Sequence, residues 1–131
     1  MLQEGCVSKG LLTLLRKLQG EAAFKDYFLG NIAAMKLHAI ETSGNRAKDF
    51  VDIFFLLKEI PLEKMFEYYR KKYSTDNIFN AKRSLIFFDD VPEEGWKEVR
   101  LIDQKATVNI IKETIINAVR EFNDTQIDKH A

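Results

Sequence analysis

The sequence is poor in the residues that most often carry chemistry, with one cysteine, two histidines and two prolines. Cys6 has no partner for a disulfide within the chain, which suits a reducing compartment. So few thiol and imidazole groups leave no spacing typical of a zinc site. Twenty basic and twenty acidic residues cancel, so no overall field draws the chain to nucleic acid or to a membrane. We therefore expect a cytoplasmic protein with neither of these partners.

Long apolar runs and strand patterns are also scarce. The apolar run at residues 11–15 is interrupted by Thr13 and followed by two basic residues, which is not typical of a signal peptide. No glycine-rich phosphate loop follows a predicted strand. A chain of 131 residues, 46% of them hydrophobic, fits one globular domain. We predict an all-α fold in which residues 1–131 form a compact bundle of about five or six helices.

Helical periodicity and capping residues divide the chain into three parts. The N-terminal helical segment, residues 1–30, has one helix between Ser8 and Gly20 and another from residue 21, which Gly30 ends. The middle part, residues 31–73, has a helix capped by Asn31, a loop at 42–45, a helix at 46–58 and another that starts at Pro61. The C-terminal part, residues 74–131, has a helix capped by Ser74 or Thr75, an acidic turn at 89–95, an ambiguous stretch at 96–103, a helix at 105–122 and a fraying tail.

The most apolar stretch, residues 48–57, is predicted to be the central helix, since its hydrophobic side chains cover most of the helix circumference. Asp49 and Asp52 lie three residues apart in it and therefore share one face. Buried carboxylates need water, a cation or a hydrogen-bond donor. One interpretation is a helix N-terminus with acids in its first turn, which explains Asp49 better than Asp52. The other is a functional pair of acids.

Two further features have both a structural and a functional interpretation. His38 lies between Leu37 and Ala39, where a histidine at the edge of the core is more common than a catalyst. Residues 68–73 mix tyrosines with basic side chains, as RNA-contacting surfaces do. An amphipathic helix whose lysines extend along its end explains the same pattern, and we prefer it.

The middle part also carries a longer pattern. A helix with Lys36 near its centre (residues 32–40) is followed by a short loop and then by an Arg-x-Lys-Asp-x-x-Asp sequence at residues 46–52. This order resembles the AbiEii/AbiGii toxin family of nucleotidyltransferases. Residues 56–62, the tyrosine-rich basic helix and residues 12–30 are similar to the family as well.

The resemblance has a gap between residues 30 and 31. In the family, a nucleotidyltransferase core lies at this point, with a Gly-Gly/Ser turn and an Asp-x-Asp pair that binds the metal and the nucleoside triphosphate. Here neither the Asp-x-Asp pair nor the third acid has a counterpart, so the catalytic core is missing. Phosphoryl-type transfer depends on metals and positioning. We therefore expect no transferase activity from the chain alone, and no Mg²⁺ or nucleotide unless a partner supplies the core.

The match carries five site residues over from the family. The vestigial catalytic candidates are Lys36, Asp49 and Asp52, and the two acids are also the candidates for metal ligands. The phosphate-binding candidates are Lys36, Arg46 and Lys48. Because an unpaired Asp52 on a buried helix would be costly, we expect Lys36 to approach it across two helices, with Arg46 or Lys48 nearby.

The resemblance implies a non-catalytic helical remnant that acts as a binding or interaction module, in a toxin–antitoxin or phage-defence setting. The alternative is the helical half of a split nucleotidyltransferase, and a third interpretation is a structural leftover. An antitoxin or a core-bearing chain would be the protein partner. We also expect a homodimer, because loss of the core would uncover residues 32–40 and the central helix.

Overall fold

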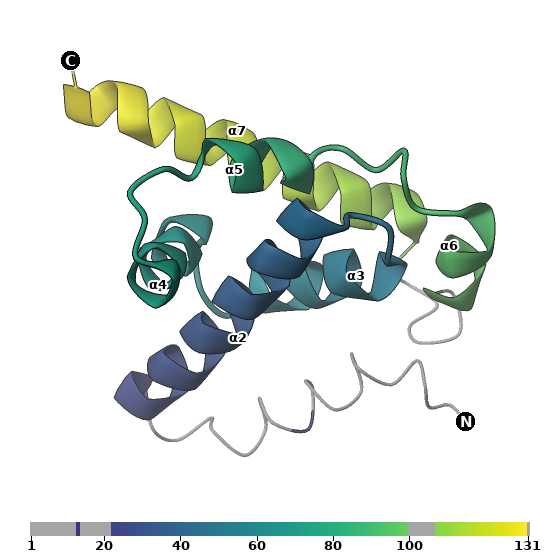
Figure 1. Cartoon of the computed structure of the whole chain (residues 1–131), viewed down its shortest axis with the longest axis horizontal. Coiled ribbons are helices and arrows are strands. Elements are labelled where there is room, and N and C mark those ends of the chain that lie inside the picture. The colour runs from purple at the N-terminus through teal and green to yellow at the C-terminus, as the bar shows by residue number, and fades with distance from the viewer. Residues whose placement is uncertain (1–12, 14–21, 100–106, 131) are drawn as a thin grey trace.

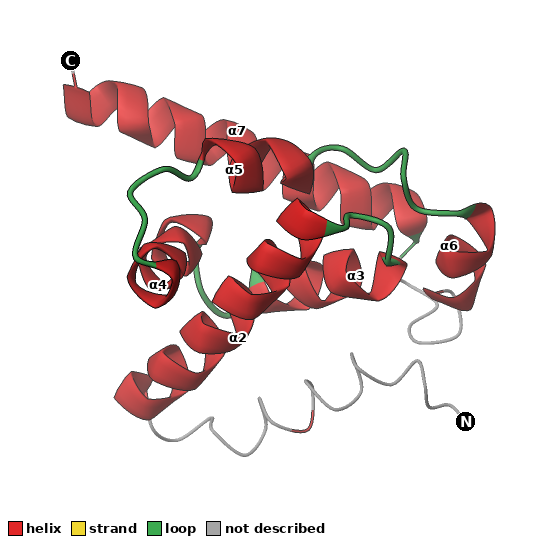
Figure 2. Ribbon diagram, in the orientation of Figure 1, coloured by secondary structure: helices red, strands yellow, loops and turns green. Residues whose placement is uncertain are grey.

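The computed structural model describes residue 13 and residues 22–99 and 107–130, and all regular secondary structure in these ranges is helical (Figures 1 and 2). The fold is therefore all-α, as predicted. The predicted helix between Ser8 and Gly20 lies outside the described ranges except for Thr13. None of the described helices is both long and apolar enough to cross a membrane. The described ranges contain six helices, which are α2 (Ala22–Thr42), α3 (Ala47–Leu56), α4 (Leu62–Tyr73), α5 (Phe79–Leu85), α6 (Glu93–Val99) and α7 (Val108–His130).

Helix α2 runs without interruption through Gly30 and Asn31, where the sequence predicted a break and a new N-cap. Gly30 faces α4, and the ring of Tyr68 occupies the space that a side chain at Gly30 would need. The side-chain nitrogen of Asn31 donates a hydrogen bond to the carbonyl oxygen of Tyr27 at 2.8 Å, inside the helix. The predicted boundary is wrong because the glycine serves a contact with another helix and not a turn.

The end of α2 follows the prediction more closely. The N–H of Ser43 donates to the carbonyl oxygen of Ala39 at 2.9 Å, and Gly44 then adopts a φ of 65°. This left-handed conformation is typical of the residue after a helix and suits glycine. The loop returns the chain toward α2, so that α3 packs against it.

Helix α3 is the central helix, as predicted. Nine of its ten residues are buried, and it contacts α2, α6 and α7. Phe50 packs against the rings of Phe88 and Trp96, at centroid distances of 5.1 and 6.1 Å. The expectation that this helix lacks cover is therefore wrong, because the remaining helices enclose it.

The segment between α4 and α5 also differs from the prediction, which made Ser74 or Thr75 the N-cap of the next helix. Ser74 is not an N-cap but the C-cap of α4, with a φ of 51°, and the N–H of Thr75 bonds back to the carbonyl oxygen of Arg70. Instead, the Asn77 side chain accepts a hydrogen bond from the N–H of Phe79, at 2.9 Å. This Asx-type bond starts α5 and satisfies one of the N–H groups that a helix end leaves free.

The C-terminal part forms two helices. Helix α6 begins within the predicted acidic turn and buries Trp96, which the sequence left ambiguous. Helix α7 continues to His130, so the prediction that the helix ends near Phe122 is wrong. Lys82 of α5 donates a hydrogen bond to the Asn123 side chain at 2.9 Å, which ties this part of α7 to the bundle. The buried apolar face of α7 consists of Ile111, Ile115, Val119 and Phe122.

Candidate functional site

The predicted site residues Lys36, Asp49 and Asp52 form a cluster between α2 and α3. The ammonium nitrogen of Lys36 lies 3.2 Å from Oδ1 of Asp49 and 2.9 Å from Oδ2 of Asp52. The Lys36 side chain is 20% exposed, whereas those of Asp49 and Asp52 are 5% and 1% exposed. The expected approach of Lys36 to Asp52 is therefore confirmed. We call these three residues the Lys36 cluster.

Local structure explains how the three side chains meet. Asp49 lies in the first turn of α3, where the positive end of the helix dipole favours a carboxylate. Asp52 follows almost one turn later and shares that face of the helix. The short loop at 43–46 folds α3 back along α2, so Lys36 reaches both acids from the neighbouring helix.

The electrostatics of the cluster keep Lys36 charged. Burial lowers the pKa of the Lys36 ammonium, but the hydrogen bond and charge of Asp52, together with those of Asp49, outweigh this effect and raise the pKa overall. An ammonium group held in its charged form donates hydrogen bonds and cannot act as a general base near neutral pH. The cluster is thus suited to charge pairing and not to proton transfer by Lys36.

The other two candidates, Arg46 and Lys48, do not join the cluster. Arg46 is the exposed N-cap residue of α3, and Lys48 is half-buried in its first turn. Among the described residues, neither forms an ion pair with Asp49 or Asp52. For Lys48 the reason is geometric, since it precedes Asp49 by one residue and adjacent residues of a helix point in directions about 100° apart. Arg46 precedes the helix, and its backbone is extended.

The cluster also lacks the form of a metal site. Within the described ranges, no group of three or more histidine, cysteine, aspartate or glutamate side chains is placed to hold a metal ion. The carboxylates of Asp49 and Asp52 contact the Lys36 ammonium, so this group occupies the position where a bound cation would balance their charge. Metal binding by these acids would first require Lys36 to leave.

A second polar cluster, which the sequence did not predict, lies where the C-terminal ends of α2 and α4 meet. The His38 ring stacks on Tyr73 at a centroid distance of 4.4 Å and an interplanar angle of 14°. The Tyr69 hydroxyl donates a hydrogen bond to the Glu41 carboxylate. Burial raises the pKa of Tyr69, and the hydrogen bond and negative charge of Glu41 raise it further.

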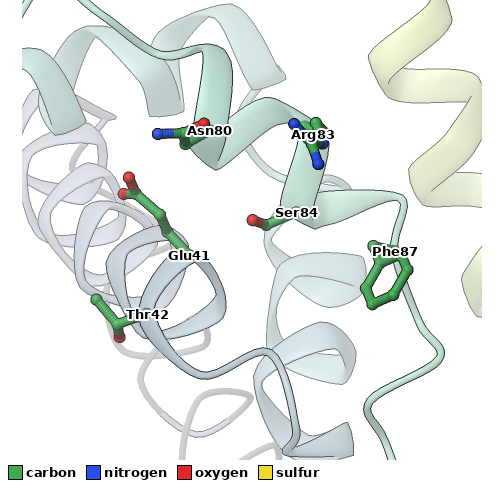
Figure 3. Close-up of a pocket in the computed structure, with 6 residues that line it drawn as sticks. All are labelled: Glu41, Thr42, Asn80, Arg83, Ser84 and Phe87. Carbon is green, nitrogen blue, oxygen red and sulfur yellow. The ribbon is translucent and has the colours of Figure 1, made fainter.

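Two open hollows adjoin this second cluster, each with a volume of about 420 Å³. They share Glu41, Thr42 and Asn80, and Figure 3 shows the one that Arg83 and Phe87 also line. Their residues come from distant parts of the chain, so no local spacing in the sequence indicates them. His38 is exposed on this surface, and its ring stacks on Tyr73, which packs against the core. This position fits the predicted histidine at the edge of the core.

The tyrosines of α4 serve packing rather than an open aromatic surface. Tyr69 is buried, and Tyr68 and Tyr73 are half-buried against the core. Lys71 and Lys72 remain exposed at the end of the helix. This arrangement supports the interpretation as an amphipathic helix over the RNA-contacting one.

Comparisons with known proteins assign no family to the chain. No family model matches it, and no solved structure does. A stretch of 71 residues, 53% of the chain, is 32% identical to a protein of Aquifex aeolicus (strain VF5) that is called "Uncharacterized protein aq_aa25". The matched stretch covers 34% of that relative, so the chain corresponds to about a third of its length.

Proposed function

We propose that this chain is a helical binding or interaction module related to the AbiEii-like nucleotidyltransferases, without transferase activity of its own. We place it in the cytoplasm, in a toxin–antitoxin or phage-defence setting. The observation that carries the proposal is the position of the Lys36 ammonium between the carboxylates of Asp49 and Asp52. In this arrangement the two carboxylates share the single positive charge of Lys36.

The burial of the two acids makes this pairing difficult to undo. Asp52 is 1% exposed and Asp49 is 5% exposed, so in this arrangement Lys36 and not bulk water balances charge on the two carboxylates. Breaking a buried ion pair by removal of one partner costs about 3–5 kcal/mol. A metal ion would have to offset this cost without the Asp-x-Asp pair that binds it in the family.

The same pairing gives the cluster a structural role. It joins α2 to α3, and α2 also packs on α4 and α5. The cluster therefore helps to hold a rigid body, and a rigid body can present its outer surfaces to a partner without a large loss of entropy on binding.

Two measurements test the proposal. The purified chain is incubated with labelled nucleoside triphosphates, Mg²⁺ and total tRNA, and we expect no incorporation above a heat-killed control. Isothermal titration with the Mg²⁺-bound triphosphates should show no binding heat. Incorporation that Asp49→Ala abolishes would contradict the proposal, since it would assign catalysis to the cluster itself.

One observation favours the second candidate, a split nucleotidyltransferase whose core lies on another chain. The Lys36 side chain is 20% exposed although its two partners are buried, so part of Lys36 reaches the surface beside the cluster. A nucleotide phosphate held by another chain could contact it there. If a neighbouring gene encodes an Asp-x-Asp core, activity of the mixed chains should fall with Lys36→Met.

Lys25→Met is the matched control for the split-enzyme test. The Lys25 side chain is also 20% exposed and also forms an ion pair, with Glu59. Equal activity of the two variants would exclude a phosphate-binding role for Lys36. A neighbouring gene for a small winged-helix protein would instead favour an antitoxin as the partner.

A further inference from the structure

One side of α2 is largely exposed, with Asn31 half-buried near its centre, and its residues follow a regular spacing. Steps of four and three residues alternate along this side, which is the heptad spacing of a helix that pairs with another helix. We call this side the α2 seam. It consists of Phe24, Phe28, Asn31, Met35, His38 and Thr42.

The opposite side of α2 already forms its share of the core. Leu29, Ala33, Leu37 and Ile40 are buried there, against α3, α4 and α5. The large side chains of the seam remain outside this packing: Phe24 is 50% exposed, and Phe28 and Met35 are exposed as well. Phe24 and Phe28 contact each other, at a ring-centroid distance of 4.6 Å. Helix α2 therefore carries large apolar side chains on two opposite sides, and only one of these sides is needed to close the core.

The charged residues beside the seam have partners within the chain. Lys25 pairs with Glu59 at 2.5 Å, and Asp26 lies 3.9 Å from the ammonium of Lys64. The seam itself contains no aspartate, glutamate, lysine or arginine. A partner with a charged face would gain nothing from this surface, whereas a second neutral, apolar face meets no like-charge repulsion.

We propose that the α2 seam pairs with the α2 seam of a second copy of this chain, antiparallel about a two-fold axis at Asn31. The spacing of the seam residues favours a second copy of the chain as the partner, because Asn31 is midway between Phe24 and His38. An antiparallel pair centred there places Phe24 opposite His38, Phe28 within one residue of the position opposite Met35, and Asn31 opposite its own copy. The seam is thus complementary to itself.

Two of these three pairs have a recognised chemistry. Methionine sulfur makes favourable contacts with aromatic rings. A single asparagine in an apolar seam fixes the register and the number of helices that associate. Two-fold pairing is also the commonest closed assembly. The proposal rests on the interaction role given above, but not on the likeness to nucleotidyltransferases.

The available area is consistent with a dimer. Helix α2 has 21 residues and is therefore about 31 Å long. Each exposed aromatic or methionine side chain of the seam, and Tyr27 beside it, would bury roughly 100 Å² of additional surface in the pair. Together these side chains would bury roughly 400 Å² per copy. With the flanking polar residues, the pair approaches the total of about 1,000 Å² that separates specific interfaces from incidental contacts.

Light scattering and sedimentation over a micromolar concentration range test the association. We expect a species of twice 15.2 kDa that dissociates on dilution. Phe24→Glu should raise the dissociation constant about tenfold or more, because it places a charge in the apolar half of the seam. Phe87→Glu is the matched control, since Phe87 is 49% exposed but lies outside α2. Phe28→Glu provides a second seam variant, and circular dichroism confirms that each variant is folded.

Disulfide trapping tests the orientation in a Cys6→Ser background. Asn31→Cys should link two copies under mild oxidation, because the two-fold axis places residue 31 opposite itself. Thr42→Cys should not, since residue 42 lies at the end of the seam. A parallel pair would link through both positions and would overturn the antiparallel arrangement.

Two other outcomes would overturn the proposal as a whole. One is a 15.2 kDa species throughout the concentration range. The other is a dimer that Phe24→Glu and Phe28→Glu leave intact. Neither readout involves nucleotides, so both outcomes leave the absence of transferase activity to its own test.

Discussion

The ring of Tyr68 lies against the backbone of Gly30, so closely that a β-carbon on Gly30 would be 2.2 Å from the nearest ring atom. This contact lets α4 approach α2, the helix with which it shares its most extensive packing. Gly30 lies inside an uninterrupted helix, where glycine is normally unfavourable. The close approach of the two helices explains why glycine is present there.

Gly30→Ala should therefore destabilise the protein. In an exposed helix interior, this change would stabilise by about 1 kcal/mol. Here the added methyl group displaces the Tyr68 ring, and overpacking of this kind costs about 1–3 kcal/mol. Urea unfolding measures the change in the free energy of unfolding. In a Tyr68→Ala background the same substitution should become stabilising, and stabilisation in the unmodified protein would refute the steric explanation.

Lys36→Met should cost more stability than Lys25→Met. Both lysine side chains are 20% exposed and ion-paired, but the acids that Lys36 contacts are buried, whereas Glu59 is 29% exposed. Loss of Lys36 leaves two buried carboxylates without its charge, and we expect a loss of about 2–3 kcal/mol after allowance for partial exposure. Loss of an exposed pair costs about 0–1 kcal/mol. Equal losses in urea unfolding would mean that the Lys36 cluster contributes no more than a surface pair.

The stability of the protein should fall at alkaline pH. Burial lowers the pKa of Lys36, but Asp52 and Asp49 raise it overall. Burial and Glu41 raise the pKa of Tyr69. Burial also raises the pKa of Tyr73. Each of these groups holds its proton more tightly in the folded state. Its contribution is fully present below the unfolded pKa, near 10, and is lost as the pH rises through the higher folded value, so stability should decline above about pH 10.

Urea unfolding at a series of pH values measures this decline, and Tyr69→Phe is the informative variant. It removes the hydroxyl that bonds to Glu41, so it should lower stability at neutral pH by about 1 kcal/mol. It should also make the decline above about pH 10 shallower, since one raised pKa has gone. An unchanged pH profile in this variant would contradict the coupling of Tyr69 to the folded state.

Some of this structure follows from the sequence alone. The central helix was predictable because side chains that are apolar around the whole circumference have to be buried on several sides. The approach of Lys36 to Asp52 was predictable because a buried carboxylate needs a partner and the resemblance to the AbiEii/AbiGii family indicates Lys36 on the preceding helix. Both arguments depend on burial, which the composition of a segment reveals.

Other features do not follow from the sequence, because they depend on contacts between distant residues. The role of Gly30 is set by Tyr68, which lies 38 positions away. From local sequence alone, Gly30 is predicted to end one helix and Asn31 to cap the next. Ser74 shows the same limit, since its left-handed conformation ends α4, whereas its residue type is favoured at N-caps. The surface around His38 and Glu41 likewise joins three helices that no local pattern connects.

The short loop at 43–46 also has a consequence for the order of folding. Lys36 and Asp49 are 13 positions apart, whereas Lys82 and Asn123, which join α5 to α7, are 41 positions apart. Closing the shorter loop costs less entropy, so α2 and α3 should associate before α7 docks. Substitutions at Lys36 should then slow folding, whereas Lys82→Met should mainly speed unfolding, and stopped-flow measurements separate the two. The Lys36 cluster would thus set the rate at which the protein folds as well as the strength with which its helices hold together.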